Sequence, residues 1–239
     1  MGGTGEYRGM KNRGLYAVIT GDIVGSSKLT ASQRGHLLSV LKSSFHALKN
    51  IMIDGIRAPF EIHRGDSFQG VLSKPEAALR VAIAIRTCLR HGFETKQRRH
   101  ALDARIAVGI GQIDFLPAGR GSEGDGSAFR RSGQTLDAMK GDQRLIIRTP
   151  WQEFDAEFDT ACALLDALIN RWSSEQAQAI LGQIRGLTQE KAAREFGVSQ
   201  PAVRQRLKSA GGWAIEALCR RYEQVICEKR SLQAYNKRQ

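Results

Sequence analysis

The amino-acid sequence predicts an α+β protein in two parts: a sandwich of helices and a mostly antiparallel sheet over residues 15–150, then an all-α helix-turn-helix domain over residues 173–239. Two observations predict the sandwich. Strand-like apolar runs alternate with amphipathic helical stretches, and two of the short strands flank a Gly-Asp turn. A third observation predicts the helical part, where short helical stretches are separated by glycine-containing turns.

The first part is expected to begin with a buried strand, because the run from Leu15 to Thr20 is short, apolar and rich in β-branched side chains. Thr30 and Gln33 have the spacing of a capping box, which predicts a helix up to about Ile51. The remaining elements are expected in this order: strands at 60–63 and 68–72 around a turn at 64–67, a helix at 75–91, a strand at 104–113, a helix, and a strand at 144–149. Hairpins that alternate with helices favour a sheet with its helices on one face.

A linker helix is predicted at 151–172, where apolar residues are spaced alternately three and four apart. This seam consists of Trp151, Phe154, Phe158, Ala161, Leu165, Leu168 and Trp172. The pattern is typical of a dimeric coiled coil, and equally typical of one helix that lies on its own domain. Three heptads do not separate the two, so a homodimer formed through this helix is one of two expectations.

The unit after residue 173 has the spacing of a helix-turn-helix. Helices are expected at 174–185, 188–197 and 200–209, followed by an amphipathic helix at 213–226. Ala193 supplies the small side chain that two steeply crossed helices need where they touch, and Gly197 suits the backbone of the turn. The third helix leaves four polar side chains pointing outward as candidate DNA contacts: Gln200, Arg204, Gln205 and Lys208.

Composition favours a protein of the reducing cytoplasm with a polyanionic partner. No run of about 18 apolar residues occurs, so no membrane span is expected. Residues 1–14 are Gly-rich and basic without an apolar stretch, which predicts a flexible leader. The four cysteines form no C-x-x-C pair, so no zinc site or disulfide framework is expected. The net charge of +12 is denser in the C-terminal part and favours DNA as a partner.

Two aspartates are the candidate metal ligands. Asp22 follows the first strand and Asp66 lies in the hairpin turn, positions that can face each other in a sandwich of this type. Mg²⁺ relieves the repulsion between adjacent carboxylates and binds nucleotide phosphates with them. An Asp in a Gly-Asp turn is also commonly a turn residue that bonds its own backbone. The loop after Asp22 supplies candidate phosphate-binding amides: Ile23, Val24, Gly25, Ser26 and Ser27.

Three motifs in this part, in order, resemble those of class III nucleotide cyclases and related palm-type polymerases: Asp22-Ile23-Val24-Gly25, Gly65-Asp66, and Arg105-Ile106-Ala107-Val108-Gly109-Ile110-Gly111. The resemblance implies a ferredoxin-like palm fold, a nucleoside triphosphate as ligand, and Mg²⁺ or Mn²⁺ held by Asp22 and Asp66. It also implies nucleotide contacts from a later helix, for which the candidates are Arg130, Arg131 and Gln134.

The sequence departs from the cyclase pattern at two places. The family carries an Asn and an Arg on the later helix, where this chain has Arg130 and Gln134. Its base-reading Lys or Glu corresponds here to Ile62. These departures weigh against ordinary adenylate or guanylate cyclisation.

The whole chain resembles the SatD-like bacterial proteins through Gly65-Asp66-Ser67-Phe68-Gln69-Gly70 and Ala128-Phe129-Arg130-Arg131-Ser132-Gly133, ahead of a helix-turn-helix similar to that of sigma factors. The first hypothesis is therefore a dimeric bacterial DNA-binding transcriptional regulator whose cyclase-like domain binds a nucleotide or a metal. The alternative is a metal-dependent nucleotide cyclase or nucleotidyltransferase-like enzyme with a DNA-binding appendage. A second alternative is a degenerate cyclase fold used only for dimerisation.

Overall fold

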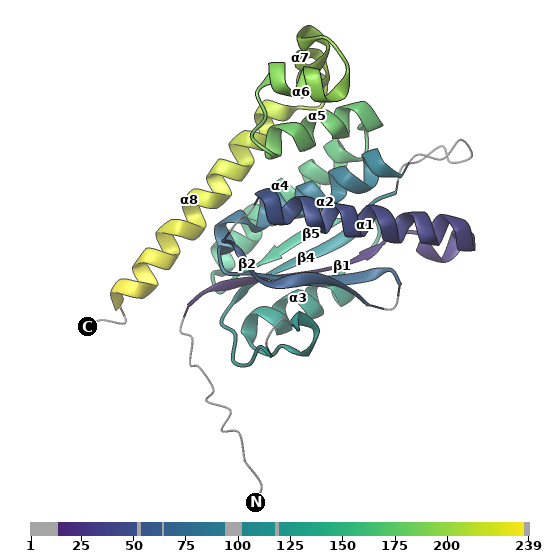
Figure 1. Cartoon of the computed structure of the whole chain (residues 1–239). Coiled ribbons are helices and arrows are strands. Elements are labelled where there is room, and N and C mark those ends of the chain that lie inside the picture. The colour runs from purple at the N-terminus through teal and green to yellow at the C-terminus, as the bar shows by residue number, and fades with distance from the viewer. Residues whose placement is uncertain (1–13, 52–53, 64, 94–101, 118–119, 237–239) are drawn as a thin grey trace, which may run out of the picture.

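A computed structural model describes residues 14–51, 54–63, 65–93, 102–117 and 120–236 (Figure 1). The expected leader therefore lies outside the described residues except for Gly14, as do Arg64 of the hairpin turn and residues 237–239 of the basic tail. The helices and strands are β1 (Tyr16–Ile23), α1 (Ala31–Ile51), β2 (Ile56–His63), β3 (Ser67–Leu72), α2 (Ala78–Gly92), β4 (Ala104–Gly111), α3 (Ser127–Ala138), β5 (Leu145–Arg148), α4 (Gln152–Ile169), α5 (Ser174–Ile184), α6 (Gln189–Phe196), α7 (Gln200–Ser209) and α8 (Gly212–Asn236). None of the described helices is long and apolar enough to cross a membrane.

The first part is α+β, as predicted, and its strands form one five-stranded mixed sheet in the order β2-β3-β1-β4-β5. β1 pairs antiparallel with both β3 and β4, and β2 pairs antiparallel with β3. This is the strand order and direction of a ferredoxin-like β-α-β-β-α-β unit. β5 is then added parallel to β4 after the crossover through α3. The predicted succession of strands, helices and hairpin is confirmed.

The helices cover both faces of the sheet, so the expectation that they lie on one face is wrong. Figure 1 shows α1 and α2 on one side and α3 on the other. Glycines in β4 explain how α3 approaches so closely. A Cβ on Gly109 would lie 2.2 Å from the carbonyl oxygen of Ala128, and one on Gly111 would lie 2.5 Å from Ser127 Oγ. The nearly continuous apolar run of β4 is what a strand buried on both faces requires.

The predicted linker helix is present as α4, and its seam packs inside the chain. Of the predicted seam, Phe158 and Leu165 are buried in the same core as the sheet and α2, whereas Trp151, Phe154 and Leu168 are partly buried against it. Trp172 is also buried, and its indole donates to the carbonyl of Ala210 at 3.0 Å. The seam is therefore not available as a coiled-coil dimer contact. The heptad spacing arises because one face of α4 is buried in its own protein.

The helices α5, α6 and α7 have bounds within one residue of those that the sequence predicts, and α8 is longer than predicted. Thr188 Oγ1 accepts from the amide of Lys191 at 3.2 Å and so caps α6. Gly197, with φ of 65°, ends α6 in the left-handed conformation that glycine adopts without strain. Ser199 caps α7 through the amide of Ala202. Two capped helices are thus joined by the short turn 197–199.

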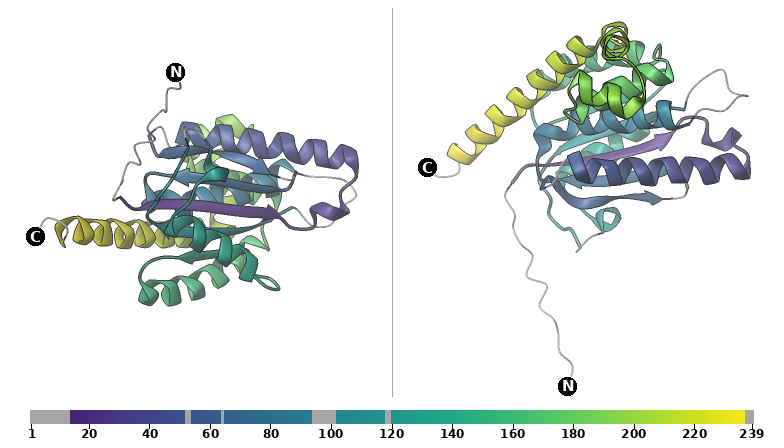
Figure 2. Two further views of the ribbon diagram at one scale, coloured as in Figure 1. Left: turned by 90° about the horizontal axis from the view of Figure 1, so that it is seen from below. Right: turned by 45° about the horizontal axis from the view of Figure 1, so that its top comes forward.

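α8 runs back from α7 past the sandwich, as Figure 2 shows, and packs on it. Tyr222 is fully buried and donates to the carbonyl of Pro75 at 2.9 Å, with its ring edge on Phe158. On the same side Arg80 of α2 binds both Glu216 and Glu223 of α8. One continuous apolar core therefore includes residues of the sandwich and of the C-terminal helices.

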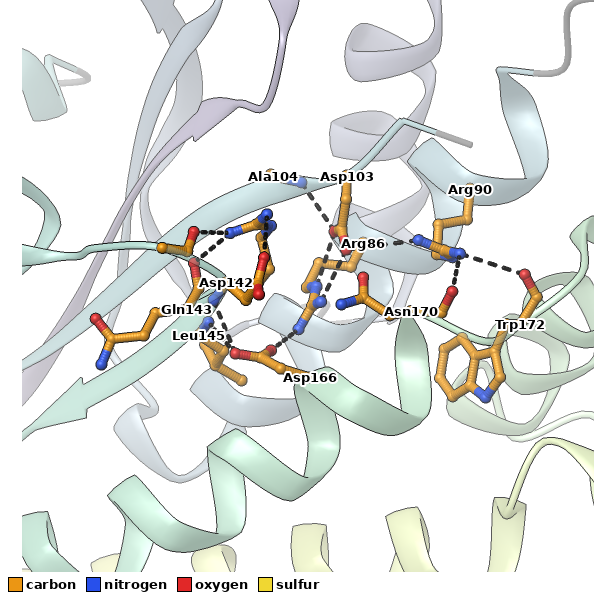
Figure 3. Close-up of polar contacts among 12 residues, drawn as sticks. Arg86, Arg90, Asp103, Ala104, Asp142, Gln143, Leu145, Asp166, Asn170 and Trp172 are labelled. Atoms are coloured by element: carbon orange, nitrogen blue, oxygen red, sulfur yellow. Dashed lines mark hydrogen bonds and ion pairs between the residues drawn. The ribbon is translucent and has the colours of Figure 1, made fainter. Parts of the chain in front are cut away.

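A buried network of charges ties α4 to α2 and to the start of β4 (Figure 3). Arg86 of α2 is fully buried and donates two bonds of 2.8 Å to Asp103 and a further bond to Asp166 of α4. Arg90, one turn later, lies 3.6 Å from Asp103 and donates to the carbonyl of Asn170 at 3.0 Å. Removing one partner of such a network leaves an uncompensated buried charge, so the network fixes how α2, α4 and β4 meet.

Candidate functional site

The candidate site lies where β1 ends beside the β2–β3 hairpin. The structure places Asp22 opposite Ser67 in the pairing of β1 with β3. Asp66 immediately precedes Ser67, so it lies at the same edge as Asp22. The amide of Ile23 donates to the carbonyl of Asp66 at 3.1 Å. Ser26 Oγ donates to the Asp66 carboxylate at 2.6 Å. The β1 end, its loop and the hairpin aspartate thus form one hydrogen-bonded unit, and the role of the two carboxylates as metal ligands stays a prediction.

Cross-strand pairing extends this edge into a polar row. His63 pairs with Ser67, Ser67 with Asp22, and Asp22 with Arg105 of β4. Directly paired residues lie on the same face of a sheet, so the four side chains share the face that α3 covers. His63 Nε2 is buried and has no hydrogen-bond partner among the described residues. Only the strand register places His63 in this row.

The loop after Asp22 offers fewer free amides than the sequence predicts. The amide of Ile23 is bound to Asp66, and that of Val24 donates to the carbonyl of Asp103 at 2.9 Å. Neither is therefore available to a phosphate. Gly25 has a φ of 70° and begins a short 3₁₀ turn at Ser26–Lys28, whose first amides precede any internal bond. Gly25, Ser26 and Ser27 remain as candidate phosphate donors.

Arg105 is the residue that sequence reasoning missed. Its guanidinium donates Nε to Asp22 Oδ1 at 2.9 Å and a second bond from Nη2 to Oδ2. This bidentate bond to Asp22 raises the pKa of Arg105. The Arg105 side chain is 36% exposed and that of Asp22 23%, so the pair is in contact with solvent. No signal in the sequence marks this pair, because Arg105 becomes the partner of Asp22 only through the register of β1 with β4.

The side chains at this edge have the chemistry of divalent-cation ligands, but Arg105 competes with a cation for the carboxylate of Asp22. Asp22 and Asp66 provide carboxylate oxygens, and Mg²⁺ commonly binds one or two carboxylates together with substrate phosphates. No group of three or more His, Cys, Asp or Glu side chains suited to a metal is found in the described ranges. A cation at Asp22 must displace Arg105. Partly exposed ion pairs contribute about 0–1 kcal/mol, so this displacement costs little.

The predicted nucleotide contacts of α3 are not brought to this edge. Arg130 is bound to Asp125 at 2.8 Å and lies 3.5 Å from Asp114. Arg131 donates to the carbonyl of Ile110 at 3.0 Å, and with Gln134 it lines a cavity of about 370 Å³ beside β5. Asp22 and Asp66 do not line that cavity.

A second polar surface is the outer side of α7. Gln200, Arg204, Gln205 and Lys208 are all exposed, as the sequence predicts. Gln200 donates to Gln189 at 2.9 Å and Gln205 to Ser209 at 3.3 Å. Arg204 and Lys208 have no ion-pair or hydrogen-bond partner within the described part of the chain. Below this surface Val203 packs on Ala192 and Ala193, which fixes α7 against α6.

Comparisons with known proteins give structural matches only. No family model matches the chain, so the resemblances to SatD-like proteins and to sigma factors gain no support. No curated protein matches it either. Nineteen chains of solved structures match.

The structural matches include nucleotide cyclases, of which three illustrate the range. The active GGEEF domain of a diguanylate cyclase from Vibrio cholerae has 21% identity and a TM-score of 0.40, covering 56% of this chain and 83% of that one. Adenylate cyclases from Trypanosoma brucei, in their monomeric state, have 13% identity and a TM-score of 0.38, covering 56% and 73%. A dimeric guanylyl cyclase domain from Blastocladiella emersonii has 15% identity and a TM-score of 0.37, covering 53% and 75%. The fold assignment itself rests on the strand order given above.

Proposed function

We propose that the first part of this protein binds a nucleoside triphosphate together with Mg²⁺ or Mn²⁺ at the edge formed by Asp22, Asp66 and the loop that follows Asp22, as a nucleotide-cyclase-like domain. The observation that carries the proposal is the hydrogen-bonded unit of β1 end and hairpin, in which Ile23 binds the Asp66 backbone and Ser26 its carboxylate. Two carboxylates and a hydroxyl gathered at one edge of a palm-like sheet suit a metal-bound triphosphate.

The charges at this edge determine which groups would meet the ligand. When bound, the cation would offset the negative charge of the triphosphate beside the two carboxylates. Arg105, released from Asp22, is a cationic group that could then bind a phosphate oxygen. The amides of Gly25, Ser26 and Ser27 are the neutral donors that remain.

We propose binding and not catalysis as the first property of this site, because the arginine of α3 that would complete a cyclase site is engaged in other ion pairs. Arg130 is held by two aspartates, and neither ion pair involves the candidate edge. A bound triphosphate could still react with a hydroxyl or a water molecule. The purified protein should therefore be incubated with each nucleoside triphosphate and Mg²⁺ or Mn²⁺, and the products analysed by chromatography.

Thermal unfolding tests the binding site directly. A ligand that binds only the folded state raises the melting temperature by mass action. Millimolar Mg²⁺ with a nucleoside triphosphate should raise that of the parent protein, and Asp66→Asn should abolish the rise. Asp54→Asn is the matched control, since Asp54 is exposed and precedes β2 at the end of that strand opposite His63. An unchanged parent melting curve with every triphosphate would overturn the proposal and favour a palm fold without a nucleotide.

A second candidate function, sequence-specific DNA binding, is favoured by the exposed face of α7. Arg204 and Lys208 are cations without a partner in the described chain, on a helix held by a capped turn. Gln and Arg can read base edges in the major groove, and Lys binds phosphate. A homodimer would present two such helices to two half-sites, through a contact other than the buried α4 seam. A DNA partner agrees with the cytoplasmic localisation that the composition favours.

Duplex binding is tested with variants of α7. After selection of a preferred duplex, Gln205→Ala should relax base preference by about 1–3 kcal/mol at the contacted position, while Lys208→Gln should weaken all sequences alike. Arg57→Gln is the control, because Arg57 is an exposed arginine of β2. If selection enriches no sequence, this second candidate fails while the nucleotide site remains to be judged by its own melting curves.

A further inference from the structure

A hollow on the surface lies between α7 and α8. It has a volume of about 770 Å³ and is open to solvent along one side. Its charged and aromatic lining comes from both helices: Arg204, Lys208, Trp213, Glu216, Arg220 and Arg221. We call it the α7–α8 groove. It is separate from the nucleotide edge and shares only Arg204 and Lys208 with the polar face of α7.

Trp213 is the unusual residue of this groove. Its side chain is 78% exposed at the start of α8. The other two tryptophans are used in packing: Trp172 is buried with its indole nitrogen bonded, and Trp151 lies under the ammonium of Lys229. Indole rings normally bury their large apolar area, so one held in the open beside a groove indicates a surface that meets a partner.

The charge of the groove indicates what kind of partner that is. Glu216 is its one acidic lining residue, and it is already bound by Arg80 at 2.8 Å and by Arg220 at 2.8 Å. Arg221 lies 3.5 Å from Glu157, at the far limit of an ion pair. Arg204 and Lys208 have no partner in the described residues. The groove therefore carries a net positive charge around an exposed aromatic ring.

We infer that the α7–α8 groove binds a single strand of nucleic acid, with Trp213 stacking on an unpaired base and Arg204, Lys208 and Arg220 contacting its phosphates. A basic groove with an exposed aromatic side chain is the arrangement that single-strand-binding proteins use. A duplex keeps its bases stacked on one another, so a paired base offers no free face to Trp213. A peptide partner would need acidic groups to meet the cations and an apolar group to meet the ring. No other feature of the groove lining indicates such a peptide.

The test measures binding of fluorescein-labelled oligothymidine, about 15 nucleotides long, to the full chain. The parent protein should bind it with quenching of tryptophan fluorescence. Trp213→Ala should weaken binding roughly tenfold or more, as loss of one base–aromatic stack does. Trp213→Phe keeps a stacking ring, so it should bind nearly as the parent does while the quenching is lost. Leu232→Ala is the control, because Leu232 is a similarly exposed apolar residue at the far end of α8.

Each outcome decides the inference. Equal binding by Trp213→Ala and the parent would overturn it, as would an absence of oligothymidine binding. A duplex of the same length that bound as tightly and quenched as strongly would also overturn it, and would assign the groove to double-stranded DNA. Because Asp66→Asn leaves the groove intact, it should bind oligothymidine like the parent, so failure of the nucleotide site and failure of this inference are distinguishable.

Discussion

The guanidinium of Arg105 and the carboxylate of Asp22 face each other across neighbouring strands and form a bidentate ion pair. The pair neutralises one of the two carboxylates on which a metal site depends. It is partly exposed, so a cation can displace the guanidinium at small cost. Arg105 thus acts as an internal counter-ion of the candidate site.

Replacing Arg105 should make Asp22 available to metal ions. Arg105→Gln removes the competing charge, so Mn²⁺ without nucleotide should bind up to about fivefold more tightly, the ratio that corresponds to about 1 kcal/mol. Isothermal titration calorimetry measures this affinity. Arg148→Gln, which breaks a comparable pair with Asp159, should leave it unchanged. Weaker Mn²⁺ binding by Arg105→Gln would show that the guanidinium does not compete with the metal.

Because only Asp22 is paired with Arg105, the two aspartate variants should differ in stability in the metal-free protein. Asp22→Asn loses an ionic partner of Arg105 and should lower the free energy of unfolding by about 0.5–1 kcal/mol. Asp66→Asn keeps an oxygen that can accept from Ser26, so its stability should stay close to that of the parent. Urea unfolding in the presence of a chelator compares the three proteins. An Asp22→Asn variant more stable than the parent would mean that the two carboxylates repel without compensation.

Neighbouring leucines of α4 test where its apolar seam packs. Leu165 is 4% exposed and Leu164 is 70% exposed. Leu165→Ala should lower the free energy of unfolding by about 2–5 kcal/mol, whereas Leu164→Ala should change it by less than about 0.5 kcal/mol. Chemical unfolding gives both values, and light scattering gives the oligomeric state. A stable Leu165→Ala protein that only dissociates from dimer to monomer would restore the coiled-coil interpretation.

The buried charge network should be costly to break from its centre. Arg86→Met leaves Asp166 and part of Asp103 without their partner in a dry interior, and should destabilise the fold by about 3–5 kcal/mol. Arg120→Met breaks the exposed pair with Glu123 and should cost less than about 1 kcal/mol. Urea unfolding at neutral pH measures both, and a cost for Arg86→Met no larger than that of the control would argue that the interior is hydrated.

The attachment of α8 should weaken in acid. Hydrogen bonds from Arg80 are the main cause that lowers the pKa of Glu216 from about 4.5 to about 2. A depressed folded-state pKa adds stability that is complete above the unfolded value and is lost as the pH falls toward the folded one.

The stability difference between the parent and Glu216→Gln isolates this carboxylate from the others. The difference should be constant above about pH 5 and should shrink between about pH 4.5 and pH 2. Urea unfolding over a pH series measures it. A difference that stays constant down to about pH 2.5 would mean that Arg80 and Glu216 are not paired in solution.

Local rules in the sequence determined most of the elements. The capping box at Thr30 and Gln33 forms with both of its bonds, because it depends only on residues three apart. The turn at Gly197 and the caps of α6 and α7 follow for the same reason. The adjacency of Asp22 and Asp66 also followed from element order, because the end of a first strand lies beside the hairpin of its neighbours in such a sheet.

Tertiary structure decided what depends on contacts between distant residues. A periodic apolar seam fixes which face of α4 is buried, whereas only the packed chain shows that its own core covers that face. The side of the sheet on which α3 lies depends on two glycines that let backbone meet backbone. The pairing of Arg105 with Asp22 depends on strand register across 83 residues of sequence. A pairing between residues so far apart leaves no local pattern, so the sequence alone could bring two carboxylates to one end of the sheet but not the arginine that neutralises one of them.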